Sequence, residues 1–428
     1  MNAGFYIIMA AQFFSSLADN ALLVAAIALL MQADAPSWLT PYLKFFFVIS
    51  YVALAPYVGA FADRLPKGQI MLIANGIKIL GCIAMLFGTH PMLSYALVGL
   101  GAAAYSPAKY GILTEYLPHR KLVIANGWIE GLTVASILLG TVLGGILIHV
   151  RTSGVLLAID LPLIDTPIDT PAEAAISLIV AVYAIAAVFN LHVPNTGVAM
   201  KPLPTHPVDT IKDFWRCVGH LWRDRLGQIS LAVTTLFWGA GATLQFIVIE
   251  WARTALGFDL SRAAILQGIT AVGIAIGAVL ASVWVSLDRS VRVIPLGILM
   301  GIVVIAMVFV HQVWLAVILM VLIGALAGFF VVPMNALLQH RGHHLVGAGR
   351  SIAVQNFNEN TSILIMIALY SWLLHVGHSI YMVITVFGLF VAGTMTLVQW
   401  WYRRNCRVHG EEMERLLAFA RAEVPGRN

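Results

Sequence analysis

Charge is scarce in this sequence. Of its 428 residues only 11% are charged, whereas 60% are hydrophobic, and the mean hydropathy is +0.89. Soluble domains carry about 25% charged residues, because their surfaces must be polar. The low charge therefore excludes a cytosolic enzyme and a disordered scaffold. It also excludes a nucleic-acid binder, although the net charge is +5 and the pI is near 9.1.

Cysteine and catalytic motifs are scarce as well. The three cysteines, Cys82, Cys217 and Cys406, are far apart, so they form neither a disulfide framework nor a metal-ligand spacing. The sequence has no GxSxG elbow, no P-loop and no HExxH motif. None of its 13 histidines is followed five positions later by the aspartate of glycerolipid acyltransferases. We therefore expect no enzymatic activity, no ATP-driven pump, no cofactor and no metal site.

Long apolar runs are abundant instead. About 20 apolar residues span a bilayer as a helix, and a helix satisfies its own backbone polar groups in hydrocarbon. The sequence therefore predicts an all-α membrane protein. The first run follows Met1-Asn2 directly, with no basic segment or cleavage site, so we interpret it as a retained helix and not a signal peptide. The twelve predicted transmembrane helices are 5–32, 42–62, 69–89, 92–113, 122–149, 173–192, 227–251, 263–286, 291–310, 313–338, 350–375 and 379–402.

The basic residues predict the orientation of these spans. With both termini cytoplasmic, 18 of the 25 Lys and Arg residues fall on the inner side and four on the outer side. This is a strong positive-inside bias. The outer set is Lys44, Arg151, Arg253 and Arg262, next to an acidic outer loop with Asp160, Asp165, Asp169 and Glu173.

A polar stretch divides the chain into two halves. Residues 193–226 are rich in proline and charge and predict a linker with a short amphipathic helix at 208–223. Motifs recur across it at offsets of 225 to 229, which indicates pseudo-symmetric repeats, as in transporters that rock around a midplane site. The recurring pairs are Asp63-Arg64 with Asp288-Arg289, Pro107 with Pro333, and Glu130 with Glu359. The predicted domains are an N-terminal six-helix bundle (1–192), a cytoplasmic linker (193–226), a C-terminal six-helix bundle (227–402) and a cytoplasmic tail (403–428).

We consider seven ionisable residues that lie within the predicted spans. A charge at the bilayer centre costs about 2.5–3.5 kcal/mol, so each needs a partner or a wet cavity. One interpretation is a polar cavity for a charged or zwitterionic head group, with some pairs acting as gates. The other is a set of structural ion pairs. The seven residues are Asp19, Lys78, Lys109, Glu130, Glu250, Arg350 and Glu359.

The depth of a residue in its span helps to choose between these two interpretations. Asp19 lies 14 residues into the first span, near the midplane, with Asn20 beside it, so we favour a role in transport. Glu250 lies near the outer end of its span, one turn from Arg253, and we expect the two to pair.

The two lysines leave both interpretations open. Lys78 and Lys109 can bind a head group, but a lysine can also extend its ammonium to the interface. Lys109 follows Pro107, which can break the helix and free backbone carbonyls.

The eleventh predicted span carries an unusual number of amides. Gln355 and Asn358 flank Asn356, Glu359 and Asn360, and the last three are spaced i, i+3 and i+4 on one helix face. Polar groups in a membrane helix need internal partners. We interpret Asn356, Glu359 and Asn360 as lining or gating residues.

A charged turn follows the second predicted span, from Gly59 to Lys67. Its carboxylate can bind the positive end of a neighbouring helix, and its glycine permits close approach. The alternative is an ordinary charged turn. We assign this turn, as a conformational gate, the residues Gly59, Asp63, Arg64 and Lys67. Its recurrence in the second half, which we call the echo turn, contributes Asp288 and Arg289.

Four basic side chains follow the tenth predicted span: His340, Arg341, His343 and His344. Such histidines can bind metal or respond to pH. Since no acidic or cysteine ligand lies beside them, we favour a cytoplasmic loop of the positive-inside type.

The residues also resemble a known family. The turn after the second span is similar to the signature of the major facilitator superfamily. Five blocks resemble the bacterial lysophospholipid transporter family: Ala18–Leu23, Gly101–Leu113, Leu236–Gly241, Phe329–Gln339 and Ala353–Asn360. The resemblance covers nearly all spans, but neither residues 150–226 nor the tail.

The resemblance implies an inner-membrane protein of bacteria, and we expect it to be a monomer. Members of this family move lysophospholipids, chiefly lysophosphatidylethanolamine, to the cytoplasmic leaflet, where an acyltransferase or acyl-carrier ligase re-acylates them. It implies roles for Asp19, Lys109, Glu130 and Glu359. We expect energy-independent movement with lateral access between helices of the two halves, because the embedded acids are scattered and form no proton relay.

One residue departs from the family pattern. The resemblance implies a base where this chain has Gln245, so a phosphate contact made by such a base needs another group here. Two alternatives stay open: a transporter of another amphiphile on the same fold, and a non-transporting membrane scaffold.

Overall fold

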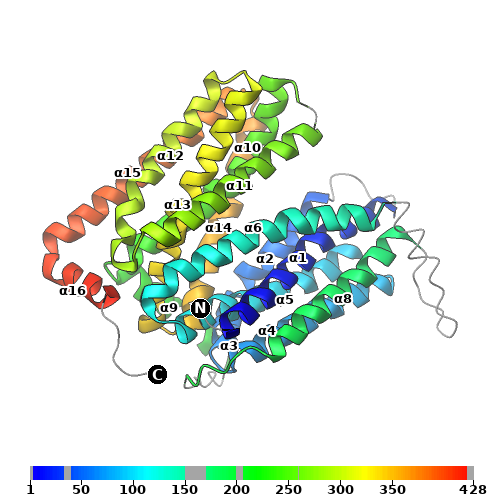
Figure 1. Cartoon of the computed structure of the whole chain (residues 1–428), viewed down its shortest axis with the longest axis horizontal. Coiled ribbons are helices and arrows are strands. Elements are labelled where there is room, and N and C mark those ends of the chain that lie inside the picture. Colours follow the sequence, from blue (N-terminus) through cyan, green and yellow to red (C-terminus); the bar gives the residue numbers. More distant parts are fainter. Residues whose placement is uncertain (1–2, 33–39, 150–169, 199–205, 259, 422–428) are drawn as a thin grey trace. The chain divides into compact units, whose positions relative to one another are not determined.

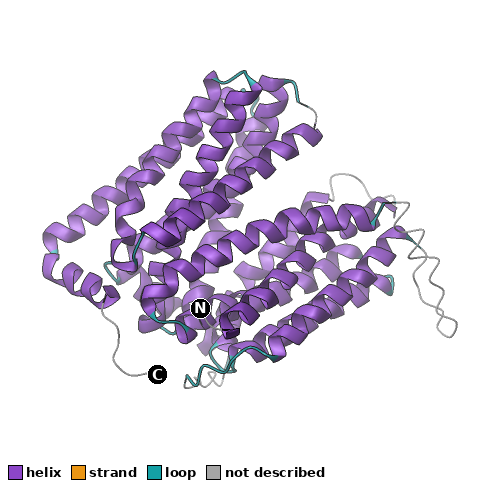
Figure 2. Cartoon of the chain, in the orientation of Figure 1, coloured by secondary structure: helices purple, strands orange, loops and turns teal. Residues whose placement is uncertain are grey.

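The computed structural model describes residues 3–32, 40–149, 170–198, 206–258 and 260–421. Within these ranges every regular element is a helix, as Figure 2 shows. The predicted acidic outer loop at Asp160, Asp165 and Asp169 lies outside the described residues. The all-α fold class predicted from the apolar runs is confirmed.

The chain forms two compact units, which we describe separately. Unit 1 comprises 1–115, 135–214 and 348–353, and unit 2 comprises 116–134, 215–347 and 354–428. Several helices therefore contribute to both units, with the boundary inside the helix. The division into an N-terminal bundle, linker, C-terminal bundle and tail stays a prediction.

In unit 1 both α1 and α4 pack against α8 (Figure 1). Small residues let helix backbones approach closely in a membrane. A Cβ at Gly140 would lie 2.7 Å from the Leu17 carbonyl oxygen, so α6 packs directly against α1. The helices of unit 1 are α1 (Ala3–Gln32), α2 (Thr40–Ala53), α3 (Ala55–Ala62), α4 (Lys67–Leu86), α5 (Pro91–Tyr116) and α8 (Pro171–Leu191). Two further helices belong to it only in part: α6 (Leu122–Leu147) from residue 135 on, and α9 (Pro207–Arg223) up to residue 214.

Unit 2 has two tight helix pairs, α11 with α13 and α12 with α15. A Cβ at Gly277 would collide with the carbonyl oxygen of Ala325, so only glycine fits at this position between α11 and α13. The elements are the 3-10 turn η2 (His119–Lys121), α10 (Gly227–Leu256), α11 (Leu260–Trp284), η3 (Leu287–Val293), α12 (Ile294–Ala306), η4 (Met307–Phe309), α13 (Val313–Leu345), α14 (Ala348–His375, mainly in this unit), α15 (Ile380–Val408) and α16 (Gly410–Arg421).

Nine helices among the described residues are long and apolar enough to cross a membrane. The pair α2 and α3, bent by 63° around Leu54, makes a tenth if it forms one span. Two other predicted spans are helical as well, α5 and α14, but they fall short because polar residues such as Lys109 and Asn356 lower their hydropathy. Twelve spans therefore stay a prediction.

Three local expectations are tested by these helices. The amphipathic linker helix is confirmed as α9, one residue longer than expected. Pro107 does not break its helix, because α5 continues through it to Tyr116. The loop expected at His340 to His344 is wrong, whereas its cytoplasmic side stays a prediction. Those residues continue α13, since buried packing holds His340 and Arg341 within the helix.

Candidate functional site

A buried ionic cluster occupies the interior of unit 1. The Lys78 ammonium on α4 donates to the Asp19 carboxylate of α1 at 2.8 Å and to the Ser15 hydroxyl at 3.0 Å. The Tyr183 hydroxyl of α8 donates to the other oxygen of Asp19 at 2.6 Å. Both oxygens of Asp19 thus have a donor, and both donors come from other helices.

The side chains around Lys78 offer several partners to its ammonium. Only 1% of the residue is exposed, so it does not extend to the interface. The rings of Tyr105 and Tyr183 lie 4.9 and 5.5 Å from its ammonium, at distances where a ring face attracts a cation. A buried charge needs a partner and further hydrogen bonds, and Asp19 with Ser15 supplies both.

The cluster includes two residues that the sequence did not predict, Ser15 and Tyr183. The Ser15 hydroxyl donates onward to the Asn75 side chain at 2.7 Å. Tyr183 offered one signal: it is a phenol in the middle of an otherwise apolar run, and buried tyrosine hydroxyls usually find a partner. The partner itself lies 164 residues away along the chain.

Two predicted site residues of unit 1 have other contacts. Asn20 donates to the Ser16 carbonyl of its own helix at 2.8 Å. The Lys109 ammonium lies 4.4 Å from the ring centre of the adjacent Tyr110. Asn20 therefore contributes to the local helix, while Lys109 presents a cation on α5.

Unit 2 contains a second polar group, in which amides connect two acids. Asn335 of α13 donates to Glu130 of α6 at 3.3 Å. Gln355 of α14 donates to Glu359 at 2.7 Å and to the Asn335 side-chain oxygen at 3.1 Å. All four side chains are buried. The structure thus brings together Glu130 and Glu359, the repeat-related acids, through two neutral amides.

The remaining polar candidates of unit 2 make local contacts. Asn360 donates to the Asn356 carbonyl of its own helix at 2.8 Å. The Gln245 side chain of α10 donates to Gln267 of α11, and its backbone carbonyl accepts from the same residue. The expected pair of Glu250 with Arg253 is confirmed at 3.4 Å, on the exposed side of α10.

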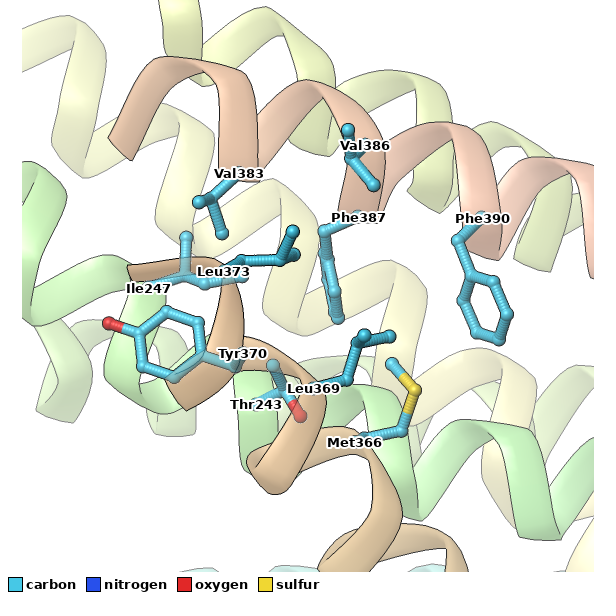
Figure 3. A pocket seen from close by; sticks show the side chains of 10 residues that line it. All are labelled: Thr243, Ile247, Met366, Leu369, Tyr370, Leu373, Val383, Val386, Phe387 and Phe390. Carbon is cyan, nitrogen blue, oxygen red and sulfur yellow. The ribbon is translucent and has the colours of Figure 1, made fainter. Parts of the chain in front are cut away.

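An apolar pocket in unit 2 lies among α10, α14 and α15. Side chains from the three helices converge on it in Figure 3, and among its lining residues only Thr243 and Tyr370 carry a polar side-chain atom. It holds about 360 Å³ of space not filled by atoms, part of it open to the surroundings. Because ligand pockets select groups of matching polarity, this one suits a slender apolar group.

The charged turn of unit 1 binds the start of α14. Asp63 accepts the backbone N–H groups of Gly349 at 2.7 Å and Arg350 at 3.2 Å, and the Arg350 guanidinium pairs with it. The positive end of a helix stabilises a carboxylate placed there. A Cβ on Gly59 would lie 2.6 Å from Ala353, so the glycine permits this approach.

The other charges of this turn are arranged around the same carboxylate. Lys67 pairs with Asp63 at 3.3 Å and with Glu115 of α5 at 3.1 Å, whereas Arg64 is exposed. Arg350 also pairs with Asp213 of α9 at 2.8 Å. The turn therefore connects α3, α5, α9 and α14 through charge. Its action as a gate stays a prediction.

The echo of this turn in unit 2 is built differently. Asp288 accepts from Ser286 at 2.7 Å and from Arg421 of α16 at 2.9 Å, while Arg289 is exposed. The partner is an exposed arginine near the end of the described chain and not a helix N-terminus.

Comparison with known proteins places these features in a family. The sequence matches the Major Facilitator Superfamily over residues 8–358. It is 43% identical to the lysophospholipid transporter LplT of Yersinia enterocolitica, over 88% of this chain and 89% of that protein. It is 44% identical to LplT of Yersinia pestis, over 86% of each chain.

Solved structures share the fold at low sequence identity. The crystal structure of the transporter FucP in the outward conformation has a TM-score of 0.69 at 14% identity, covering 93% of this chain and 98% of that one. The human organic anion transporter MFSD10 gives the same TM-score and identity over 94% of this chain and 100% of that chain. The protein is thus a multi-pass membrane protein with a transporter fold and not a member of an enzyme class. The chain belongs to the major facilitator superfamily and, within it, to the family of these lysophospholipid transporters.

Proposed function

We propose that this protein moves lysophospholipids, chiefly lysophosphatidylethanolamine, to the cytoplasmic leaflet of a bacterial inner membrane, where an acyltransferase or acyl-carrier ligase re-acylates them. The observation that carries the substrate class is the 43–44% identity to lysophospholipid transporters over 86–88% of the chain. The head group, the direction and the re-acylation are the finer parts of the proposal.

The buried charges support a zwitterionic head group. Phosphoethanolamine carries one cation and one anion, and the helices offer both kinds of partner. Asp19 and Glu359 are acids that suit the ammonium, and Lys78 and Lys109 are bases that suit the phosphate. Because Gln245 cannot supply a charge, the phosphate contact falls to the lysines. The residues proposed to bind or gate are Asp19, Asn20, Lys78, Lys109, Glu130, Gln245, Asn356, Glu359 and Asn360.

The single acyl tail of a lysolipid needs no polar path. It can remain in hydrocarbon while the head group crosses, which fits lateral access between helices. The apolar pocket that includes Thr243 and Tyr370 offers side chains of α14 and α15 that a methylene chain can contact. Since movement down a gradient needs no relay of acids, we propose facilitated diffusion without ion coupling.

Uptake in proteoliposomes tests the proposal. Purified protein is reconstituted, and labelled lysophosphatidylethanolamine, lysophosphatidylglycerol and a single-chain detergent of similar length are compared. We expect faster movement of the lysolipids, with lysophosphatidylethanolamine first, and no change when proton and sodium gradients are collapsed. Movement of the detergent alone would favour the transport of another amphiphile, and movement of none would favour a scaffold.

Reporter fusions test the proposed orientation. Fusions after residues 210 and 405 are expected to report the cytoplasm, and one near 165 the outside, because the positive-inside bias is strong. A C-terminal fusion that reports the periplasm would contradict it.

A further inference from the structure

Three histidines that are distant in sequence converge in unit 2. His340 and His344 are spaced i, i+4 and share one face of α13, and His119 comes from the 3-10 turn η2. Their rings lie 4.5 to 5.1 Å apart, centre to centre. A ligand nitrogen of each lies within 4.8 Å of the other two. The sequence pointed only to the histidines of α13, which are His340, His343 and His344, because nothing in it connects them to His119.

Several ring nitrogens of this cluster have no hydrogen-bond partner among the described residues. His340 is completely buried, and within the described part of the chain neither of its ring nitrogens is bonded. The Nδ1 atom of His119 is buried without a described partner as well. Buried polar groups are nearly always satisfied, so unsatisfied nitrogens that lie close together indicate a missing ligand.

The charge around the cluster does not oppose a cation as strongly as the sequence suggests. Arg341, next to His340, pairs with Asp224 through two contacts, at 2.5 and 3.2 Å. This pair cancels the nearest fixed positive charge. Arg120, beside His119, is exposed to water, which screens its charge.

We propose that His119, His340 and His344 form a binding site for a divalent transition-metal ion such as Zn²⁺. Three neutral imidazoles are an established ligand set for this ion, with Zn–N distances of about 2.0–2.1 Å. Tetrahedral geometry then requires nitrogens about 3.3 Å apart, so the side chains must close by at most about 1.5 Å. His344 is exposed, which leaves the fourth position open to water.

The site would join separate parts of unit 2. The ion would connect η2 to the end of α13, and the Phe419 ring of α16 covers it, 4.8 Å from the ring of His344 and 5.6 Å from that of His340. Metal binding is therefore expected to stabilise this end of the unit, because an ion that binds only the folded form shifts unfolding.

The test uses the full-length protein purified without a histidine tag and depleted of metal by a chelator. Zn²⁺ is titrated by calorimetry, thermal unfolding is followed with and without Zn²⁺, and Co²⁺ is added as a spectroscopic probe. We expect one ion per chain, a higher unfolding midpoint, and the visible absorption of tetrahedral Co²⁺. His119→Gln and His344→Gln are each expected to weaken binding at least tenfold.

A matched control decides the outcome. His343→Gln removes a neighbouring histidine of α13 that lies outside the three-residue cluster, and it is expected to bind Zn²⁺ like the unmodified protein. Should His343→Gln weaken binding as much as His344→Gln, the binding would be diffuse and the site overturned. Absence of stoichiometric binding to the unmodified protein would overturn it too. His344 is exposed, so its variant is expected to fold even if a His340 variant does not.

Discussion

The two units hold their buried acids in different ways. In unit 1 Asp19 is matched by a full opposite charge, Lys78, at 2.8 Å and by one hydroxyl donor, Tyr183, at 2.6 Å. In unit 2 Glu130 and Glu359 are connected by the neutral amides of Asn335 and Gln355. The two units therefore stabilise their acids by different chemistry.

Under the proposed function, this difference predicts that the two groups of residues bind the head group in different ways. Asp19 already pairs with Lys78, so a substrate ammonium has to replace the lysine at the carboxylate. The displaced Lys78 ammonium then becomes available to a phosphate. An acid among amides keeps its attraction for a cation, since an amide donor offsets less charge than an ammonium does.

The ion pair of unit 1 should be the most sensitive point. Lys78→Met leaves Asp19 with a buried charge and one hydroxyl donor, and breaking a buried pair costs about 3–5 kcal/mol. Since 21% of the Asp19 side chain is exposed, we expect the lower end of this range. The thermal unfolding midpoint in detergent should fall by more than that of any other variant below, and an unchanged midpoint would show that the pair contributes nothing to folding.

The charged turn of unit 1 comes next. Asp63→Asn keeps one oxygen for a backbone N–H but loses the charge that holds Lys67 and Arg350. We expect about 2 kcal/mol of destabilisation, because hydrogen bonds to charged groups contribute about 1.5–3 kcal/mol. Asp63→Glu is the control, since it keeps the charge and tests position alone. Equal stability of Asp63→Asn and the unmodified protein would contradict the assignment.

The acid–amide group of unit 2 should tolerate neutralisation better. Glu359→Gln preserves size and leaves no partner charge unpaired, so we expect at most about 1 kcal/mol of lost stability. If Glu359 attracts the head-group cation, uptake should nevertheless fall at least tenfold. A variant with normal uptake would remove Glu359 from the binding site, and a stability loss equal to that of Lys78→Met would erase the contrast between the units.

The echo turn of unit 2 should matter least. Arg421 is 76% exposed, and exposed ion pairs contribute about 0–1 kcal/mol. Arg421→Ala should therefore leave both the unfolding midpoint and uptake within error of the unmodified protein. A loss comparable to that of Asp63→Asn would show that the two turns are equivalent after all.

Hydropathy anticipated the helices closely, because each span must satisfy its own backbone and carry its own apolar surface. The predicted span 227–251 and the observed α10 begin at the same residue. Local pattern also predicted that the turn at Asp63 faces a helix N-terminus. It failed where packing extends a helix, as at His340 to His344, which continue α13.

The partners within the site could not be read from the sequence. Lys78 lies 59 residues from Asp19, and Tyr183 lies 164 residues from it, and no periodicity links them. The same holds for His119 and His340. The sequence identified which polar residues are unfavourable in a membrane, but only the fold determines which of them pair with one another.

The most direct measurement separates folding from transport at the ionic cluster. Asp19→Asn combined with Lys78→Met removes both charges, so no buried charge is left unpaired and the protein should recover most of the stability lost in Lys78→Met. Glu250→Gln with Arg253→Met is the matched control, because it removes one exposed acid–base pair. Uptake of labelled lysophosphatidylethanolamine is then measured in proteoliposomes containing equal amounts of folded protein. We predict that the Asp19/Lys78 double variant is folded but transports nothing, while the control transports normally. Normal uptake by the folded Asp19/Lys78 double variant would show that the cluster is structural and would contradict its proposed role in binding the head group.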